Sequence, residues 1–144
     1  MSDKNVTVDS TDAVYMGKAL ELARRGLFST RPNPRVGCVV VKNDKVIAEG
    51  WHQKAGDHHA EVYALMHAGA DASDATLYVT LEPCSHYGKT PPCARSVAKA
   101  GLKRVVIAMR DPNPLVAGQG IAYLQAQGIE VIVGVLEREA RELN

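Results

Sequence analysis

Short apolar runs that alternate with helix-like stretches constrain the fold of this chain more than any other feature. The runs cover residues 36–41, 76–80, 105–109 and 130–133 and are rich in β-branched residues, which favour strands. The first run is apolar throughout, as expected of a strand that is buried on both faces. Strands that alternate with helices predict a sheet packed between layers of helices.

The first apolar run opens a hairpin. A polar turn at 42–45 follows it, and Val46-Ile47-Ala48 then begins a returning strand. The antiparallel pairing of this hairpin makes the expected sheet a mixed one. We therefore predict an α/β fold, a three-layer α/β/α sandwich around a central mixed five-stranded sheet.

The segments around the strands show helical periodicity and predict five helices. Four are expected at 12–26, 59–70, 93–100 and 119–127, and a short fifth at the C-terminus. The face expected to be buried in the first helix consists of Met16, Ala19, Leu20, Ala23 and Leu27. The face expected in the second consists of Val62, Leu65, Met66 and Gly69. Residues 1–11 are polar and aperiodic, so we predict a flexible leader at 1–11 and one folded domain at 12–144.

Composition and charge exclude several classes of protein. The 144 residues, 46% hydrophobic and 23% charged, match one ordinary globular domain and not a disordered tail or a fibre. The 17 Lys and Arg nearly balance the 16 Asp and Glu, so the chain lacks the excess positive charge that is typical of proteins that bind duplex nucleic acid or an anionic membrane. The sequence shows no secretory signal and no apolar stretch long enough to cross a bilayer, so we expect a cytoplasmic protein. Thiols stay reduced there, and the three cysteines become candidates for metal binding or catalysis.

Residues of metal-binding type stand where two of the predicted helices begin. His59-Ala60-Glu61 opens one helix, and Pro83-Cys84, followed by eight residues and Cys93, leads into the next. A neutral imidazole and two thiolates suit Zn²⁺, since the three ligands together cancel the charge of the metal. Three protein ligands leave a fourth position for water, whose pKa zinc lowers to about 7. We therefore predict one catalytic zinc ion per chain, held by His59, Cys84 and Cys93.

Glu61 is the predicted catalytic residue. It lies two residues beyond His59, so it need not bind the metal and can take a proton from water and return it to a leaving amine. An H-x-E triplet followed by Pro-Cys and a second cysteine is typical of zinc deaminases. The alternative is a zinc-stabilised binding module without catalysis, in which such a carboxylate has no use.

The remaining cysteine and two further histidines are expected outside this centre. Cys38 lies within an apolar strand, so we predict a small buried hydrophobic residue. His58 is expected in a loop, and His67 on the surface of its helix.

Several longer stretches resemble a known family. They are HAEV at 59–62, TLEPCSHYGKTPPC at 80–93 and DPNP at 111–114, together with PNP at 32–34 and GWH at 50–52. These stretches closely resemble the deaminase domain of the bifunctional riboflavin-biosynthesis deaminase/reductases, from about Val14 to Asn144. The eight-residue spacer between the cysteines is specific, because most cytidine-deaminase-like enzymes have only two residues there. The resemblance implies the cytidine-deaminase-like fold.

The resemblance also implies a reaction and a set of substrate contacts. The substrate would be 2,5-diamino-6-ribosylamino-4(3H)-pyrimidinone 5′-phosphate, deaminated by water with release of ammonia. Lys89, beside Gly88, is a flexible cation suited to a phosphate or ribose. Asn and Asp next to Pro are also common turn formers, and lysine is usually exposed, so purely structural roles stay open. The positions that match the substrate-binding set are Asn33, His52, His86, Lys89, Asp111 and Asn113.

Partners follow partly from the residues and partly from the resemblance. A nucleoside or tRNA deaminase of the same superfamily would need a basic groove or an aromatic platform for a flipped base. Only 5% of residues are aromatic, so we expect a small phosphorylated pyrimidine as partner, with no nucleic acid and no membrane. A homo-oligomer, dimeric or larger, is also expected. The bifunctional family continues into a reductase domain, whereas this sequence ends at Leu143-Asn144. The chain is therefore expected to be either a stand-alone deaminase or an excised domain, with a reductase supplied elsewhere.

Overall fold

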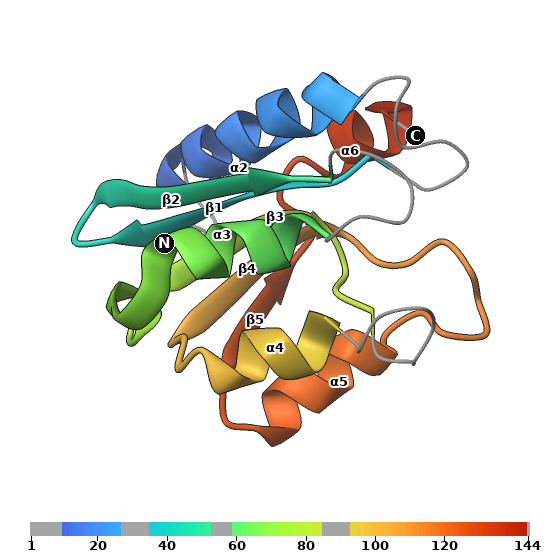
Figure 1. The fold of residues 1–144 in the computed structure, drawn as a ribbon. Coiled ribbons are helices and arrows are strands. Elements are labelled where there is room, and N and C mark those ends of the chain that lie inside the picture. The colour runs from blue at the N-terminus through green and yellow to red at the C-terminus, as the bar shows by residue number, and fades with distance from the viewer. Residues whose placement is uncertain (1–9, 27–34, 53–58, 85–92, 144) are drawn as a thin grey trace, which may run out of the picture.

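The computed structural model describes residues 10–26, 35–52, 59–84 and 93–143 (Figure 1). Its elements follow the predicted order of helices and strands, with two short 3₁₀ helices added. In chain order they are α2 (Ser10–Ala23), η1 (Arg24–Gly26), β1 (Gly37–Lys42), β2 (Lys45–Trp51), α3 (Ala60–Ala68), η2 (Gly69–Ala72), β3 (Thr76–Leu81), α4 (Cys93–Lys99), β4 (Arg104–Met109), α5 (Gln119–Ala126), β5 (Glu130–Val133) and α6 (Glu137–Leu143).

The described strands form one mixed sheet. Five strands lie in the order β2-β1-β3-β4-β5. β1 pairs antiparallel with both β2 and β3, whereas β3, β4 and β5 run parallel to one another. The predicted mixed five-stranded sheet and its opening hairpin are therefore confirmed. Because β3 and β4 are parallel, the segments that leave their carboxyl ends emerge at the same edge of the sheet.

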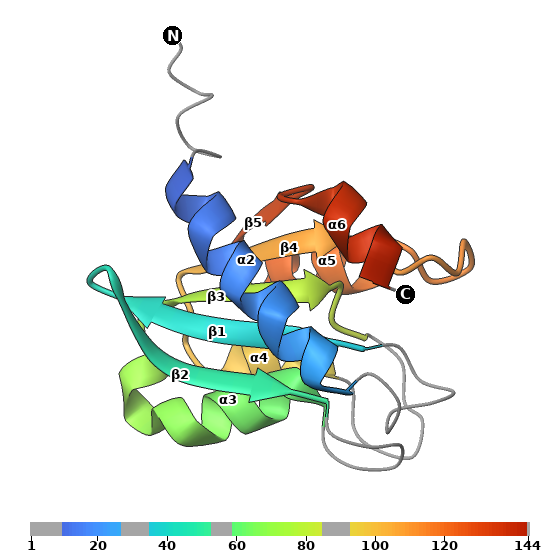
Figure 2. The same cartoon turned by 90° about the horizontal axis from the view of Figure 1, so that it is seen from above.

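Helices cover both faces of the sheet, which confirms the predicted three layers. α2 and α6 lie on one face, and α3, α4 and α5 lie on the other (Figures 1 and 2). Each layer of helices closes its own hydrophobic core over alternate residues of the central strands. The strand residues in the core under α2 and α6 include Val39, Val41, Tyr78, Val106 and Ala108. Those in the core under α3, α4 and α5 include Cys38, Val40, Leu77, Val79, Val105 and Ile107.

Within the described residues, the α-helices agree with the prediction in number and differ in detail. α2 begins at Ser10, two residues before the predicted start. Its buried residues include Met16, Ala19, Leu20 and Ala23 as predicted, while Leu27 lies outside the described residues. No helix within the described ranges is long and apolar enough to cross a membrane.

The buried face predicted for α3 is wrong in part: Leu65 is partly buried against the core, whereas Met66 and Gly69 are exposed. Ala60, Ala64 and Ala68 are buried together with Glu61, whereas Met66 is 64% exposed. The reason is a close approach to β2: a Cβ at Gly50 would lie 2.3 Å from the carbonyl oxygen of Ala60 and 2.7 Å from the amide nitrogen of Ala64. Small residues on both elements let the helix backbone rest directly on the strand, and Met66 points outward.

Gly50→Ala tests this close approach. We expect it to lower the free energy of unfolding by about 1–3 kcal/mol, since the added methyl group meets backbone atoms that cannot rotate away. Gly17→Ala is the matched control, because a Cβ at Gly17 inside α2 would meet nothing within 4 Å. It should leave stability unchanged or raise it by about 0.5–1 kcal/mol. Urea denaturation measures both, and equal stability of Gly50→Ala and the unmodified chain would contradict this packing.

A partly buried ion pair ties α2 to the sheet at the end where β3 and β4 begin. Arg104 donates from Nη1 to Asp12 Oδ1 at 3.0 Å and from Nη2 to Asp12 Oδ2 at 2.8 Å. The hydroxyl of Tyr78 donates to the same Oδ1 at 2.6 Å. These side chains line a polar hollow of about 680 Å³. The hollow lies at the opposite end of β3 and β4 from the site described next.

Candidate functional site

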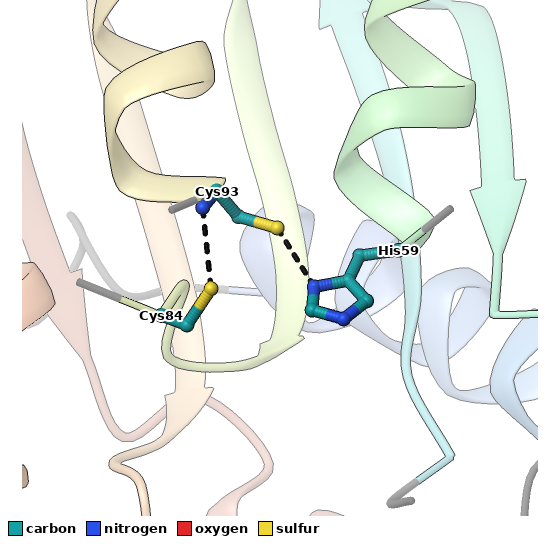
Figure 3. Close-up of side chains that lie close together, drawn as sticks. All are labelled: His59, Cys84 and Cys93. Atoms are coloured by element: carbon teal, nitrogen blue, oxygen red, sulfur yellow. Dashed lines mark hydrogen bonds between the residues drawn. The ribbon is translucent and has the colours of Figure 1, made fainter. Parts of the chain in front are cut away.

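A cluster of three potential metal ligands lies at the edge of the sheet where β3 ends. Cys84 comes three residues after β3, His59 immediately precedes α3, and Cys93 is the first residue of α4. Figure 3 shows the three side chains pointing toward one another. One ligand atom from each residue lies within 4.8 Å of the other two. The predicted ligand set is thus brought together from three separate segments.

Local hydrogen bonds explain how the two cysteines meet. The N–H of Ala94 donates to the carbonyl oxygen of Cys84 at 2.9 Å. The N–H of Cys93 donates to Cys84 Sγ at 3.2 Å (Figure 3). The start of α4 is therefore bound back onto the segment after β3, which holds the thiols side by side although nine positions separate them.

His59 is held by the start of α3. It occupies the N-cap in an extended conformation, with φ −74° and ψ 164°, and its carbonyl oxygen accepts from the N–H of Val62 at 3.1 Å. Its side chain makes no capping hydrogen bond. The ring turns toward the cysteines instead, and Nδ1 lies 2.8 Å from Cys93 Sγ.

The electrostatics of the cluster favour a thiolate. The pKa of Cys84 falls to about 4, chiefly because the Cys93 thiol donates a hydrogen bond to it, with His59 and the Cys93 N–H adding to the effect. The pKa of Cys93 rises, chiefly because the same hydrogen bond holds its proton. The pKa of His59 is also raised, chiefly by its hydrogen bond with Cys84. A metal ion would replace the protons shared among these three groups.

The donor set fits zinc. Two sulfurs and one imidazole nitrogen are ligands that Zn²⁺ binds in proteins, and catalytic sites combine three such ligands with one open position. Cys93 is buried, and His59 and Cys84 are half-buried, so a fourth position can still face solvent or substrate. The arrangement is suited to one zinc ion per chain.

Glu61 lies in the first turn of α3 next to this cluster. The residue is only 3% exposed. Burial raises the pKa of its carboxyl to about 7, and the charges of His59 and Cys84 act on it as well. Cys38, fully buried behind the cluster as predicted, has a raised pKa through burial and the nearby charge of Glu61. A buried carboxyl beside three metal ligands can hold or release a proton there.

His52 lies against the cluster of three potential metal ligands. It directly follows β2, and its backbone N–H donates to the carbonyl oxygen of Val36 at 3.0 Å. Its ring is buried and meets the ring of His59 edge-on, with the centroids 5.4 Å apart. The structure therefore places this predicted substrate-binding residue beside a metal ligand.

Asp111 and Asn113 shape the loop that follows β4. Asp111 Oδ1 accepts from the N–H of Asn113 at 2.9 Å, and Asn113 Oδ1 accepts from the N–H of Leu115 at 3.0 Å. Both residues are thus turn formers, as the structural alternative required. Each keeps a second polar group, the Oδ2 of Asp111 and the amide NH₂ of Asn113, which pairs with nothing in the described part of the chain. The two roles are therefore compatible.

The other sequence predictions fall into two groups. His67 is exposed on α3, as predicted, and lies 3.2 Å from the carbonyl oxygen of Glu49. Asn33, His58, His86 and Lys89 lie outside the described residues.

Glu82 is a residue of the site to which the sequence interpretation gave no role. It lies two positions before Cys84, is buried, and accepts three backbone hydrogen bonds from the region of Asp111 to Ile121. A glutamate directly after a buried strand was the available signal. The donors are 29 to 39 residues away in sequence, so no local pattern connects them to it.

Comparison with protein families gives one match over most of the chain. The model of the cytidine and deoxycytidylate deaminase zinc-binding region matches residues 9–109. This range includes Glu61 and all three potential metal ligands.

Named relatives fall into a short and a long class. The diaminohydroxyphosphoribosylamino-pyrimidine deaminase of Buchnera aphidicola subsp. Acyrthosiphon pisum (strain APS) is 53% identical over 133 residues, which make up 92% of this chain and 90% of that protein. The riboflavin biosynthesis protein RibD of Escherichia coli (strain K12) is 56% identical over 133 residues. That match covers 92% of this chain and only 36% of the relative.

Solved structures show the same two classes. Acinetobacter baumannii RibD, form 1, matches with a TM-score of 0.92 at 59% identity, over 93% of this chain and 38% of that one. Aspergillus oryzae Rib2 deaminase in complex with DARIPP, a C-terminal deletion mutant, matches with a TM-score of 0.74 at 26% identity, over 93% and 90%. The fold is thus shared with both, and the chain corresponds to a fraction of the longer RibD proteins.

Proposed function

Because the chain belongs to the cytidine and deoxycytidylate deaminase zinc-binding family, and within it to the diaminohydroxyphosphoribosylaminopyrimidine deaminases, we propose that it deaminates 2,5-diamino-6-ribosylamino-4(3H)-pyrimidinone 5′-phosphate. Water replaces the ring amino group, and the products are 5-amino-6-ribosylaminouracil 5′-phosphate and ammonia. This is a step of riboflavin biosynthesis.

The observation that carries this proposal is the convergence of His59, Cys84 and Cys93 beside the buried Glu61. The three ligands would hold zinc, which when bound supplies a Lewis acid that activates water at neutral pH. A structural zinc site needs neither an open position nor an adjacent buried carboxyl. The arrangement therefore favours hydrolysis over a purely structural role.

Glu61 would move the protons of this reaction. Its carboxylate takes one proton from the attacking water and delivers it to the departing ring amino group, which leaves as ammonia. Burial keeps bulk water away from the carboxyl, so the same proton can be passed on within the site. His52, packed against the His59 ring, would contact the substrate from the side of β2.

Recognition of the substrate would draw on the loops around this edge of the sheet. The amide NH₂ of Asn113 can donate to a ring or ribose oxygen, and the free carboxylate oxygen of Asp111 can accept from a hydroxyl or amine. Asn33, His86 and Lys89 complete the proposed set, with Lys89 as the candidate for phosphate. The complex of Aspergillus oryzae Rib2 deaminase with DARIPP supports a ligand of this kind.

The test offers three substrates side by side to the zinc-loaded protein: the ribosylaminopyrimidine phosphate, cytidine and a tRNA anticodon stem. We expect ammonia release from the first alone. Turnover of cytidine or the tRNA stem instead would favour a nucleoside or tRNA deaminase, and zinc binding without any turnover would favour a non-catalytic module.

Assembly and location stay predictions. A homo-oligomer, dimeric or larger, is expected in solution, and sedimentation velocity measures it. A cytoplasmic location is expected, and neither nucleic acid nor membrane is expected as a partner.

A further inference from the structure

The side-chain carboxylate of Glu82 is buried and has no role in the proposed mechanism. The residue is 5% exposed. Its Oε1 accepts from the backbone N–H groups of Asp111 and Gly118, both at 3.0 Å, and its Oε2 accepts from the N–H of Ile121 at 3.1 Å. A charged group is retained in a protein interior only where hydrogen bonds replace its lost hydration. Here three backbone donors do so.

These donors bracket a single loop. Asp111 lies just after β4, and Gly118 directly precedes α5, so one carboxylate oxygen joins both ends of the loop. The other oxygen binds Ile121 in the first turn of α5. The loop between them also carries Asn113, with its internal turns described above.

Two further backbone contacts tie the loop to the segment that carries Cys84. The backbone N–H of Glu82 donates to the carbonyl oxygen of Met109 at 3.0 Å, which extends the pairing of β3 with β4. A Cβ at Gly120 would lie 2.1 Å from the carbonyl oxygen of Pro83, so the start of α5 rests directly on the segment that leads into Cys84. The position of the loop is therefore defined relative to Cys84.

We propose that Glu82 is a positioning residue that sets the loop from Asp111 to Gly118 against the metal ligands, so that Asp111 and Asn113 meet the substrate. This inference rests on the proposed function. Glu82 does not touch the reacting atoms and acts through the loop.

The chemistry requires a carboxylate at this position. Two acceptor oxygens without a proton can receive three N–H donors, whereas the amide of Gln keeps one oxygen and turns an NH₂ group toward a backbone N–H. Glu82→Gln has nearly the same size, so it removes hydrogen bonds without opening a cavity. Glu82→Asp keeps the charge on a shorter side chain and serves as the second variant should Glu82→Gln fail to fold.

The experiment uses the zinc-loaded protein and three readouts: zinc content, amide hydrogen exchange, and kcat and KM for the ribosylaminopyrimidine phosphate. In Glu82→Gln we expect full zinc content and exchange at Asp111, Gly118 and Ile121 about tenfold faster or more. We expect kcat/KM to fall about 10–100-fold, mainly through KM, because a displaced loop weakens binding of substrate and transition state alike.

Asp12→Asn is the matched control. It changes another buried carboxylate, paired with Arg104 at the opposite end of β3 and β4, and should lower stability while KM and the three exchange rates stay unchanged. Unchanged exchange in Glu82→Gln would overturn the proposal. Faster exchange with unchanged KM would also overturn it, since Glu82 would then stabilise the loop without positioning it for substrate.

Failure of the proposed function would look different. The unmodified protein would then release no ammonia from this substrate, whatever Glu82 does. Calorimetric binding of the same substrate to the unmodified protein and to Glu82→Gln would still judge the positioning role, and equal affinities would reject it.

Discussion

Glu61→Gln is expected to lower turnover by about 10²–10⁴-fold, the usual contribution of a general acid–base group, while zinc stays bound. The amide of Gln cannot accept a proton from water and return it to the leaving amine. Since burial disfavours the charged carboxylate at this position, a neutral amide of the same size should not destabilise the fold. The measurement is the rate of ammonia release, with zinc content determined on the same sample.

The control for this variant is Glu21→Gln. Glu21 is exposed on α2, on the face of the sheet opposite α3, so its amide should leave turnover unchanged. Ammonia release by Glu61→Gln at the unmodified rate would remove Glu61 from the mechanism. Loss of zinc from Glu61→Gln would instead mean that this side chain helps to hold the metal.

Cys84→Ala is expected to lose the metal. The remaining two ligands, His59 and Cys93, leave the ion with too few protein bonds, and bound zinc should fall from about one equivalent per chain to near zero. A ligand that binds only the folded state adds about 2.7 kcal/mol of stability at 100 times its Kd. The rise in unfolding temperature that zinc gives the unmodified protein should therefore disappear in this variant.

Cys38→Ala provides the matched control within the same chain. Cys38 is fully buried on β1 near the cluster, yet it is not among the three residues whose ligand atoms converge. This variant should keep its zinc and the zinc-dependent rise in unfolding temperature. Zinc retained by Cys84→Ala and lost from Cys38→Ala would show that the ligand set is different.

Some parts of the fold could be predicted because their signal is local. β1, β3 and β4 are short runs rich in β-branched residues, and the buried face of α2 follows from apolar residues at helical spacing. The face of α3 could not be predicted in this way. Hydrophobic spacing predicted that Met66 is buried. In the structure Ala60 and Ala64 are buried instead, because the absence of a side chain at Gly50 lets the helix backbone approach β2 closely. Periodicity records the polarity of each side chain and carries no information on how closely another backbone approaches.

The site divides in a similar manner. The grouping of His59, Cys84 and Cys93 could be predicted from the sequence, because zinc chemistry requires these residue types, and the structure brings them together. The catalytic role of Glu61 beside them stays a prediction. Asn113 gave two possible interpretations, and the structure shows that its side-chain oxygen accepts a hydrogen bond within a turn, while its contact with substrate stays a prediction.

The sequence by itself determined the order of the elements, the metal chemistry and the family resemblance, since all three depend on residue types at short separations. Only the tertiary structure decided which side of α3 is buried, that His52 packs against His59, and that Glu82 binds both ends of a distant loop. The first and the third depend on backbone groups of different elements that meet in space, and the second depends on how the end of β2 packs against the start of α3. Such meetings leave no periodic trace in the sequence, because a backbone N–H or a close approach is available at almost any residue.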